Sequence, residues 1–531
     1  MGVYKRACRG GKYFKTGRHM IKRLDNVKLN ITDSESKLLE VARKNLKGEV
    51  KYFKILKKSL DARDKNNLKW VYSVACSSDC ENEEVQEFEK IKNPPKVIII
   101  GSGPAGLFCA LRLIEHGIRP IIVERGESVE NRVKTTQKFF GDGALDVNSN
   151  VQFGEGGAGT FSDGKLNTQT HDGLNRDVLK IFHRFGAPQE ILYLNKPHIG
   201  SDNLYSILSS VRKYVIENGG EYLFNTLFCG FIEKDGKIRS VLLKNVKTGE
   251  QTEMSAECVV AALGHSSRDT FGMLNASKIA MEPRDFAIGV RIEHLAESIG
   301  FAQYGKNFRL LPTADYKLVS HAHERTVFTF CMCPGGVVIP AASEEGGVVV
   351  NGMSLYARKG INSNSALMVQ MKKSDFGEGL FDGMNFQREI ERKAFLCGGK
   401  NYKAPVQTYG DFAKDKVSSS FGDVKPTYAA GTAFAPLGEI LPKIAVDALK
   451  VAIQDMDGKL RGFASPSALL TGVETRFSSP VKILRNENGE SVSLKGFYPC
   501  GEGSGYSGGI TSSAADGLGV AEKIFNNIKN H

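Results

Sequence analysis

The strongest hydrophobic pattern in the chain lies between residues 96 and 126. Four consecutive apolar residues, 97–100, predict a strand that is buried on both faces. The chain then passes through a glycine-rich turn, 101–106, into a segment whose apolar residues recur with helical spacing. A second apolar run, 120–123, ends on Glu124. This order of strand, turn, helix and strand predicts a βαβ unit.

The glycines of this turn suit the pyrophosphate of a dinucleotide. Gly101 allows the tight turn, Gly103 lets the backbone approach the phosphates, and Gly106 lets helix and strand pack closely. Glu124 follows Gly101 by 23 residues, a spacing that suits a hydrogen bond from a ribose hydroxyl. The same glycine pattern recurs at 154–159 and 503–508, but only the first copy lies between a strand and a helix. We therefore predict a dinucleotide site here; the alternative is a glycine-rich turn without a ligand.

The rest of the pattern predicts the domain organisation. A β-α-β-β order at the N-terminal end is typical of a small α+β module, and an acidic, proline-containing stretch after it is typical of a linker. Later, alternating strands with frequent turns indicate a mainly antiparallel layer that interrupts the nucleotide domain. We expect a basic extension at 1–19, an N-terminal module at 20–75, a linker at 76–95, the nucleotide domain at 96–284 and 431–531, and an inserted substrate domain at 285–430.

Three more segments combine glycine with small polar residues. Residues 150–167 carry many glycines and few bulky side chains, which indicates either close contact with a flat ligand or an ordinary surface loop. A buried strand near 258–262 ends in a similar way. The chain closes with a short strand, a glycine loop and a terminal helix, 496–528, so we expect the last element to fold back onto the first domain.

Composition indicates a globular protein with several domains. The chain has 531 residues, 41% of them hydrophobic and 24% charged, which is too long for one ordinary core. No apolar run is long enough to span a membrane, and the basic first 20 residues lack the apolar segment of a signal peptide. We expect a cytoplasmic protein without a membrane partner. The ten cysteines show no zinc spacing, so we predict no metal site.

The basic charge is concentrated at the N-terminal end. Of the net charge of +12, residues 1–95 contribute +9, and residues 1–19 hold six basic and no acidic side chains. This pattern favours a solvated tail, or translation that begins at Met20, over an arm that binds nucleic acid.

Several motifs together resemble the uncharacterised bacterial FAD-dependent dehydrogenase family. Besides the βαβ unit, these are NVQFGEGGAGTFSDGKL, VVAALGHSSRDTF, FAIGVRIEH, CMCPGG, NGMS, GVETRFSSPV and YPCGEGSGYSGGITSSAADGL. That family is distantly related to aminoacetone-oxidase-like flavoproteins. The resemblance covers about residues 20–530. It implies an α/β fold: a glutathione-reductase-type, Rossmann-like FAD-binding domain, an inserted β-rich substrate domain and a small N-terminal α+β module.

The resemblance also implies which residues bind FAD. The pyrophosphate would lie against Gly101, Ser102, Gly103, Pro104, Ala105 and Gly106, and the adenosine against Glu124, Arg125 and Phe228. Ala262, Gly264 and His265 would end the strand beneath the nucleotide, and Gly501 and Glu502 would flank the ribityl chain. The remaining set would lie at the flavin: Gly157, Thr160, Asp163, Lys165, Gly509, Ile510 and Thr511.

Catalytic residues are not assigned by the sequence. Cys331 and Cys333 are either redox-active or buried apolar residues, and their CxC spacing, strained as a disulfide, favours the second role. His265 is a candidate proton donor, or a simple hydrogen-bonding partner. A last set either orients an anionic substrate or forms ion pairs between domains: Arg291, Glu293, His294, Arg476 and Tyr506.

These observations favour an FAD-dependent oxidoreductase that acts on a small molecule. The chain has no second strand–glycine–helix–acid unit for NAD(P)H, so a nicotinamide would serve only as a transient co-substrate. Two alternatives stay open: an FAD-dependent protein that modifies or binds RNA through its basic module, and a scaffold that holds FAD structurally. The substrate and the oligomeric state are left open by the sequence.

Overall fold

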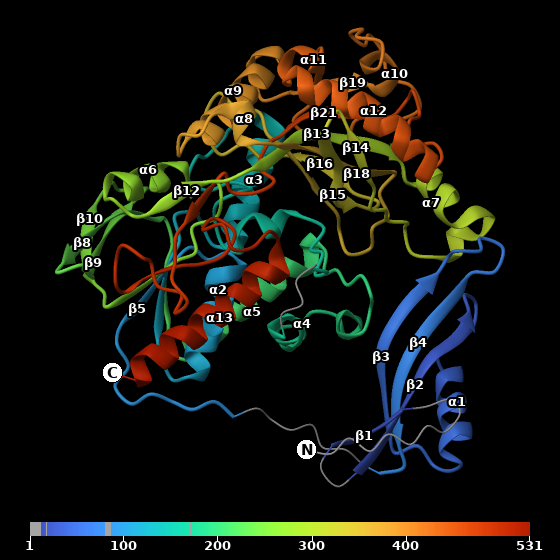
Figure 1. The fold of residues 1–531 in the computed structure, drawn as a ribbon, viewed down its shortest axis with the longest axis horizontal. Coiled ribbons are helices and arrows are strands. Elements are labelled where there is room, and N and C mark those ends of the chain that lie inside the picture. The colour runs from blue at the N-terminus through green and yellow to red at the C-terminus, as the bar shows by residue number, and fades with distance from the viewer. Residues whose placement is uncertain (1–11, 17–18, 80–86, 169–172, 531) are drawn as a thin grey trace.

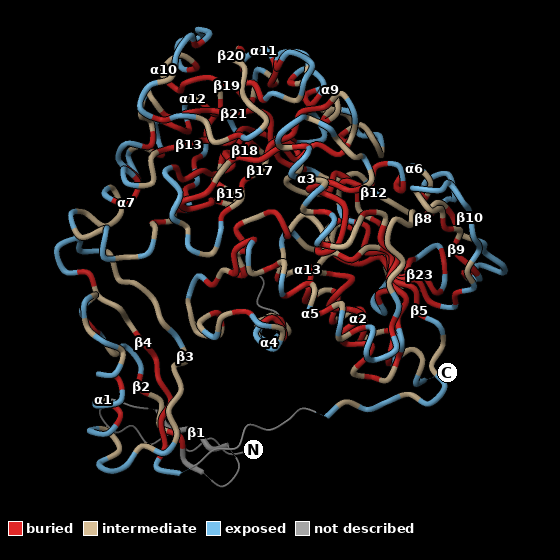
Figure 2. The backbone as a smooth tube through the Cα atoms, turned by 180° about the vertical axis from the view of Figure 1, so that it is seen from behind, coloured by how far each residue is buried: buried red, intermediate tan, exposed pale blue. Residues whose placement is uncertain are grey.

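The chain forms two large α/β regions and a small N-terminal module (Figure 1). The computed structural model describes residues 12–16, 19–79, 87–168 and 173–530. One large region is built on a parallel sheet, and the other on a mixed sheet. The buried backbone is concentrated in these two sheets and in the helices packed on them (Figure 2). Within the described ranges, no helix combines the length and the apolar character needed to cross a membrane.

The first region contains a five-stranded sheet in the order β23-β11-β5-β6-β7, in which every pair is parallel. All four residues of β5, β6 and β11 are buried, as their unbroken apolar runs predict. A three-stranded antiparallel sheet, β10-β9-β8, accompanies it. The strands are β5 (Val97–Ile100), β6 (Pro120–Val123), β7 (Glu221–Leu223), β8 (Thr226–Lys234), β9 (Lys237–Asn245), β10 (Gln251–Ser255), β11 (Cys258–Ala261) and β23 (Phe497–Pro499).

Helices from both ends of the chain cover the parallel sheet. These are α2 (Pro104–Glu115), α3 (Val129–Asp142), α4 (Leu174–Arg184), α5 (Ser201–Glu217), α6 (Arg268–Ala276) and α13 (Ile510–Lys529), with short 3-10 helices at Gly157–Phe161 and Gln189–Leu192. The terminal helix α13 packs directly on α2. A Cβ atom at Gly517 would lie 2.1 Å from the carbonyl oxygen of Ala105, so the two backbones touch without a side chain between them. The end of the chain thus folds back onto its first βαβ unit.

The second region is a seven-stranded sheet in the order β14-β15-β18-β13-β21-β19-β20. Only β19 and β20 pair in parallel. The sheet takes in β21, which lies beyond the boundary at residue 430 expected for an inserted domain. Its strands are β13 (Phe286–Leu295), β14 (Val319–Ala322), β15 (Arg325–Cys333), β18 (Asn362–Met371), β19 (Ala404–Thr408), β20 (Thr432–Phe434) and β21 (Leu469–Glu474). Two strand pairs lie outside it: β12 (Met281–Pro283) with β22 (Val481–Ile483), and β16 (Val337–Pro340) with β17 (Val350–Met353).

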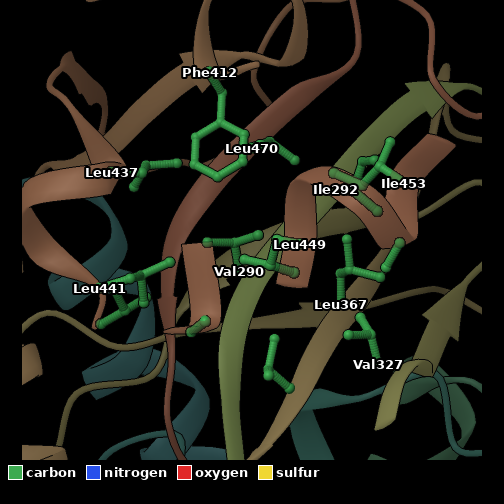
Figure 3. Close-up of a cluster of buried hydrophobic side chains, with 14 of the residues drawn as sticks. Val290, Ile292, Val327, Leu367, Phe412, Leu437, Leu441, Leu449, Ile453 and Leu470 are labelled. Atoms are coloured by element: carbon green, nitrogen blue, oxygen red, sulfur yellow. The ribbon is translucent and has the colours of Figure 1, made fainter. Parts of the chain in front are cut away.

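The two faces of this second sheet differ in chemistry. Along β13, Ile288, Val290 and Ile292 point into an apolar core, and Leu449 and Ile453 of α12 contribute to the same core (Figure 3). The residues between them on β13 point to the opposite face, because side chains alternate along a strand. The helices of this region are α7 (Ala296–Tyr304), a 3-10 helix (Gly305–Leu310), α8 (Lys373–Phe376), α9 (Asp382–Cys397), α10 (Tyr409–Phe412), α11 (Leu437–Ile440) and α12 (Lys443–Lys459).

The N-terminal module is an antiparallel sheet, β1-β2-β4-β3, with one helix on one face. Its elements are β1 (Lys12–Thr16), β2 (His19–Asn30), α1 (Lys37–Leu46), β3 (Tyr52–Asp61) and β4 (Lys69–Ser77). Strand β1 lies within the stretch expected as an extension. The module contacts the parallel-sheet region through the backbone of Lys58, whose N–H donates to Tyr193 at 2.8 Å and whose carbonyl accepts from Asn195 at 2.9 Å.

Two glycines of α13 provide a matched test of the contact between α2 and α13. Gly517→Ala places its methyl group against the α2 backbone, and overpacking of this kind costs about 1–3 kcal/mol. At Gly519 the nearest atom to a new Cβ is 3.7 Å away, so Gly519→Ala gains the usual helix stabilisation of about 0.5–1 kcal/mol. Urea unfolding followed by circular dichroism measures both. Equal midpoints for the two variants would show that the backbones do not touch.

Candidate functional site

A cavity of about 930 Å³ lies where the two large regions meet. This volume is near the upper end of the roughly 300–1,000 Å³ found for ligand pockets. One wall consists of the loops after β5, β11 and β23, together with the first residues of α2 and α13. Ligands of open α/β sheets bind at these carboxyl ends of parallel strands. The other wall includes β15 of the second sheet. Among the described residues, none before Ile100 lines the cavity, so the N-terminal module takes no part in it.

Most residues of the predicted FAD site line this one cavity, although they come from distant parts of the chain. Those that line it are Gly101, Gly103, Pro104, Ala105, Glu124, Arg125, Gly157, Lys165, Phe228, Ala262, Gly264, His265, Glu502, Gly509, Ile510 and Thr511. The chain therefore brings the first glycine turn, the loop at 150–167 and the C-terminal glycine loop together around one space.

Three predicted residues lie behind the cavity wall and shape its backbone. The Ser102 amide and hydroxyl both donate to Glu124 Oε2, at 3.0 and 2.7 Å. A Cβ at Gly106 would lie 2.0 Å from the Gly101 carbonyl oxygen, and one at Gly501 would lie 2.7 Å from the Ala105 Cβ. These positions let strand, turn and helix approach closely and do not reach into the cavity.

Thr160 and Asp163 do not line the cavity, contrary to the position expected for them at the flavin. The Thr160 hydroxyl donates to the Glu155 carbonyl at 3.1 Å, inside its own loop. Asp163 is fully buried and pairs with Arg358, whose Nε donates to Oδ1 at 2.9 Å. Polar side chains of a glycine loop thus hold the loop itself, and their presence in the motif did not reveal which way they point.

Glu124 anchors the glycine turn to the neighbouring loops. Oε2 accepts from Ser102, as described above, and Oε1 accepts from the amides of Gly126 and Gly154 at 2.9 and 3.0 Å. An ionised carboxylate offers about four acceptor positions, and these four hydrogen bonds use them. The ribose contact expected for Glu124 stays a prediction.

Two helix starts face the cavity without a side-chain cap. Neither Gly103 before α2 nor Gly509 before α13 has a capping side chain, and the first turn of each helix holds no acidic residue. Such helix starts carry unpaired N–H groups and a partial positive charge. At Gly103 the nearest atom to an added Cβ is the Gly157 Cα, 3.8 Å away, so the backbone itself borders the cavity. This donor set fits the phosphates and the electron-rich flavin edge of FAD.

A buried arginine organises the loop at 150–167. Arg132 of α3 is fully buried, and its guanidinium donates to the carbonyls of Asn150 and Val151 at 2.9 and 3.0 Å. It also donates to the carbonyls of Gly154 and Glu155, at 3.2 and 2.6 Å. The sequence does not reveal this role, because nothing in the α3 segment distinguishes its one arginine from the exposed basic residues around it.

The second wall of the cavity is aromatic. Phe328 and Phe330 of β15 pack against Phe477, with ring centroids 5.3 and 4.5 Å apart, and all three residues line the cavity. In the sequence, the only sign of this wall is the spacing of two residues between Phe328 and Phe330, which places both on one face of a strand. That spacing does not tell which face of the sheet borders a ligand.

Buried ion pairs stand behind and beside this aromatic wall. Arg291 is fully buried, and its Nε donates to Glu474 at 2.9 Å. Glu391 accepts from Arg476 at 2.8 Å and from Arg268 at 2.9 Å. Because Arg268 begins α6 and Glu391 lies on α9, this cluster joins the two regions. Arg476 thus takes part in an ion-pair cluster between the two regions, which was one of its two expected roles. The pair of Arg291 with Glu474 instead joins β13 and β21 of the same sheet.

The other candidate residues are engaged in structural hydrogen bonds. His265 Nε2 lies 2.6 Å from the Arg476 carbonyl and therefore carries the proton, and burial lowers the pKa of His265 to about 4. Burial lowers the pKa of His294 similarly, to about 4, and its Nε2 donates to the Phe463 carbonyl at 2.8 Å. Glu293 accepts from Thr427 at 2.6 Å. The Tyr506 hydroxyl donates to the Ile483 carbonyl at 3.0 Å.

Glu502 and Lys165 are two ionisable residues that line the cavity. Burial raises the pKa of Glu502 to about 8, so this carboxyl group is mainly protonated at pH 7. No side-chain hydrogen bond of Glu502 or Lys165 is found within the described residues. Among the described residues, no group of three or more His, Cys, Asp or Glu side chains is arranged to hold a metal ion.

Comparisons with known proteins find three family matches along the chain. Residues 96–159 match a family described as FAD binding domain, residues 285–477 match one described as FAD-dependent protein, C-terminal domain-like, and residues 20–77 match a domain of unknown function. The second match, like the sheet, extends beyond residue 430. An uncharacterised protein of Clostridium beijerinckii is 45% identical over 528 residues, covering 94% of this chain and 98% of its own.

Solved structures of flavoproteins are only remotely similar. The glycerol-3-phosphate dehydrogenase of Bacillus halodurans, complexed with FAD, is 12% identical, with 82% of this chain and 66% of that chain covered and a TM-score of 0.36. A flavin-dependent brominase is also 12% identical, with 82% and 80% covered and a TM-score of 0.38. At such TM-scores, neither similarity bears on the reaction of this chain.

Replacing the buried arginine tests the organisation of the glycine loop. Arg132→Met leaves four carbonyls without their donor, and each unpaired buried group costs about 1–3 kcal/mol, so we expect a loss of at least about 3 kcal/mol. Lys138→Met changes an exposed residue of the same helix and is the matched control. Urea unfolding measures the difference. The interpretation is wrong if both variants unfold at the wild-type midpoint.

Proposed function

Since the chain belongs to the family of its Clostridium beijerinckii relative and is an FAD-binding flavoprotein, we propose that it is an FAD-dependent oxidoreductase acting on a small organic molecule. The observation that carries this proposal is the shared cavity. Loops that suit FAD form one wall, and an aromatic wall from a different sheet faces them. A substrate held between the two walls would contact the cofactor directly.

The proposal includes a specific arrangement of the chain. The five-stranded parallel sheet with its three-stranded antiparallel companion corresponds to a glutathione-reductase-type FAD domain. The second sheet serves as an inserted substrate domain, and the N-terminal module stays outside the site. Bound FAD supplies two-electron transfer, while the protein supplies binding, orientation and electrostatics. NAD(P)H serves as the transient electron donor or acceptor.

Individual residues have distinct tasks in this scheme. The uncapped start of α2, next to Gly103, binds the pyrophosphate, and the start of α13, next to Gly509, stabilises negative charge on the reduced flavin. Phe328, Phe330 and Phe477 exclude water from the substrate side. Glu502 holds a proton on its carboxyl group near neutral pH and is placed to deliver it within the cavity.

Spectroscopy of the purified protein tests the function. We expect a bound flavin spectrum that bleaches under anaerobic conditions on titration with NADH or NADPH, since hydride transfer is the proposed donor step. Gly103→Leu would fill the phosphate position, and we expect the Kd for FAD to rise at least about 100-fold, or about 2.7 kcal/mol. Gly141→Leu, at an exposed helix position with open space, is its control. A bound flavin that only dithionite reduces would count against the oxidoreductase.

The protonation of Glu502 predicts how the rate of flavin reduction changes with pH. Its pKa is raised to about 8, so the carboxyl group holds its proton below pH 8 and loses it above. We expect the rate of proton-coupled flavin reduction to fall as the pH rises through about 8, and Glu502→Gln to slow the reaction about 100-fold and abolish this step. Stopped-flow absorbance across the pH range measures it. Exposed Glu487→Gln should keep the wild-type profile, and a wild-type profile in Glu502→Gln would exclude the role.

A further inference from the structure

A bulge in β15 turns the chain at Cys331 towards the cavity. Phe330 pairs with Ala366 and Cys333 pairs with Asn364, so β15 holds one residue more than β18 over this interval. Cys331 lies within the bulge and has a left-handed backbone, with a φ of 41°. Such a backbone is rare for residues other than glycine, and bulges commonly redirect a side chain beside an active site. Cys331 is half-buried and lines the cavity.

The buried Arg291 holds this bulge in place. Its Nη1 and Nη2 both donate to the Cys331 carbonyl, at 3.2 and 2.8 Å, while its Nε binds Glu474. A buried guanidinium keeps its partners because leaving them would expose an uncompensated charge. A fixed positive charge therefore lies directly behind Cys331.

The surroundings of Cys331 favour its thiolate form. A hydrogen bond with Cys333 lowers the pKa of Cys331 to about 6, and the charges of Arg291 and Lys165 act in the same direction, against the effects of burial and of the Asp163 carboxylate. Lys165 lies on the opposite, cofactor-binding wall of the cavity. Cys331 thus has two cations near it, Arg291 at its carbonyl group and Lys165 at the cavity. The thiolate, not the thiol, is the form that reacts.

Cys333 provides a second sulfur beside the first. It is fully buried, and its Sγ–H donates to the Cys331 carbonyl at 3.2 Å, so its side chain turns back towards Cys331. Burial raises the pKa of Cys333 well above its usual range. The pair therefore consists of one thiolate and one thiol, which is the protonation state from which a disulfide forms.

We propose that Cys331 and Cys333 are a redox-active pair that exchanges two electrons with the bound FAD, which rests on the function proposed above. In the oxidising direction, an S–S bond forms between the two sulfur atoms and the S–H bond of Cys333 breaks. Two electrons and that proton pass to oxidised FAD, giving FADH⁻, so atoms and charge balance. The reverse step restores one thiolate and one thiol.

The short spacing of the pair suits this role. A disulfide between residues two apart is strained, and strained disulfides are reduced more easily than structural ones. The same strain had favoured a buried apolar role for Cys331 in the sequence. At a redox cofactor it instead makes the electron exchange readily reversible, and the position of Cys331 at the cavity wall distinguishes the two roles.

Counting electrons in the intact holoprotein tests the pair. In an anaerobic dithionite titration of air-oxidised protein, we expect uptake of four electrons per FAD in the wild type, two for the flavin and two for the disulfide. We expect two electrons in Cys331→Ser and in Cys333→Ala. Cys397→Ser removes an exposed thiol of α9 and should keep the wild-type uptake. Peptide mass spectrometry without reduction should find the Cys331–Cys333 disulfide in oxidised wild type only.

A second measurement needs no variant. The alkylation rate of Cys331 by iodoacetamide, followed by mass spectrometry across the pH range in reduced holoprotein, should be half-maximal near pH 6. Cys397 should respond only near or above its ordinary pKa of about 8.5. Uptake of two electrons by the wild type, with both thiols free after air exposure, overturns the pair. If a nicotinamide still bleaches the flavin in that protein, the proposed oxidoreductase function survives; a protein that binds no flavin overturns both.

Discussion

The structure depends on one close contact between helices that lie about four hundred residues apart in the sequence. At Gly517 the α13 backbone lies against the carbonyl of Ala105 in α2, with no room for a methyl group between them. The C-terminal strand β23 joins the same parallel sheet beside β11. Because both helices begin at the same edge of this sheet, the contact brings two sets of unpaired N–H groups to one cavity. The second region, which lies between these two helices in the sequence, is therefore held over the cavity that they border.

The second sheet serves the site through the contrast between its faces. One face is mainly apolar and packs on α12, which fixes the position of β13 and its neighbours. The other face carries aromatic rings and buried charges, and burying charges is costly unless they are paired. Arg291 has Glu474, although burial raises the pKa of Glu474 to about 8, and Glu391 has both Arg268 and Arg476. Pairs of this kind contribute little net stability. The pair of Arg268 with Glu391 does link α6 of the first region to α9 of the second.

The sequence was most informative where local chemistry determines the structure. The apolar runs of β5 and β6 predicted a parallel βαβ unit. The turn between them requires glycine because its backbone lies in close contact with neighbouring backbone atoms, and this requirement is visible in the local sequence. The sequence was least informative where a side chain's direction depends on distant partners. Asp163 was expected at the ligand but pairs with Arg358, almost two hundred residues away. Arg132 and Phe477 looked ordinary in the sequence, because their importance comes from loops and strands that only the fold brings to them.

The hydrogen bonds around Glu124 and Arg132 have a further consequence for how the cofactor is acquired. Both anchors hold the loops bordering the cavity through hydrogen bonds within the protein, which favours loops that take their final shape during folding. Binding of the nucleotide then costs little backbone conformational entropy. Loss of this entropy is what weakens binding by segments that are unstructured before they bind. The preorganised protein should bind and release FAD with little change in the conformation of its backbone. The purified apoprotein should therefore be stable enough to be reconstituted.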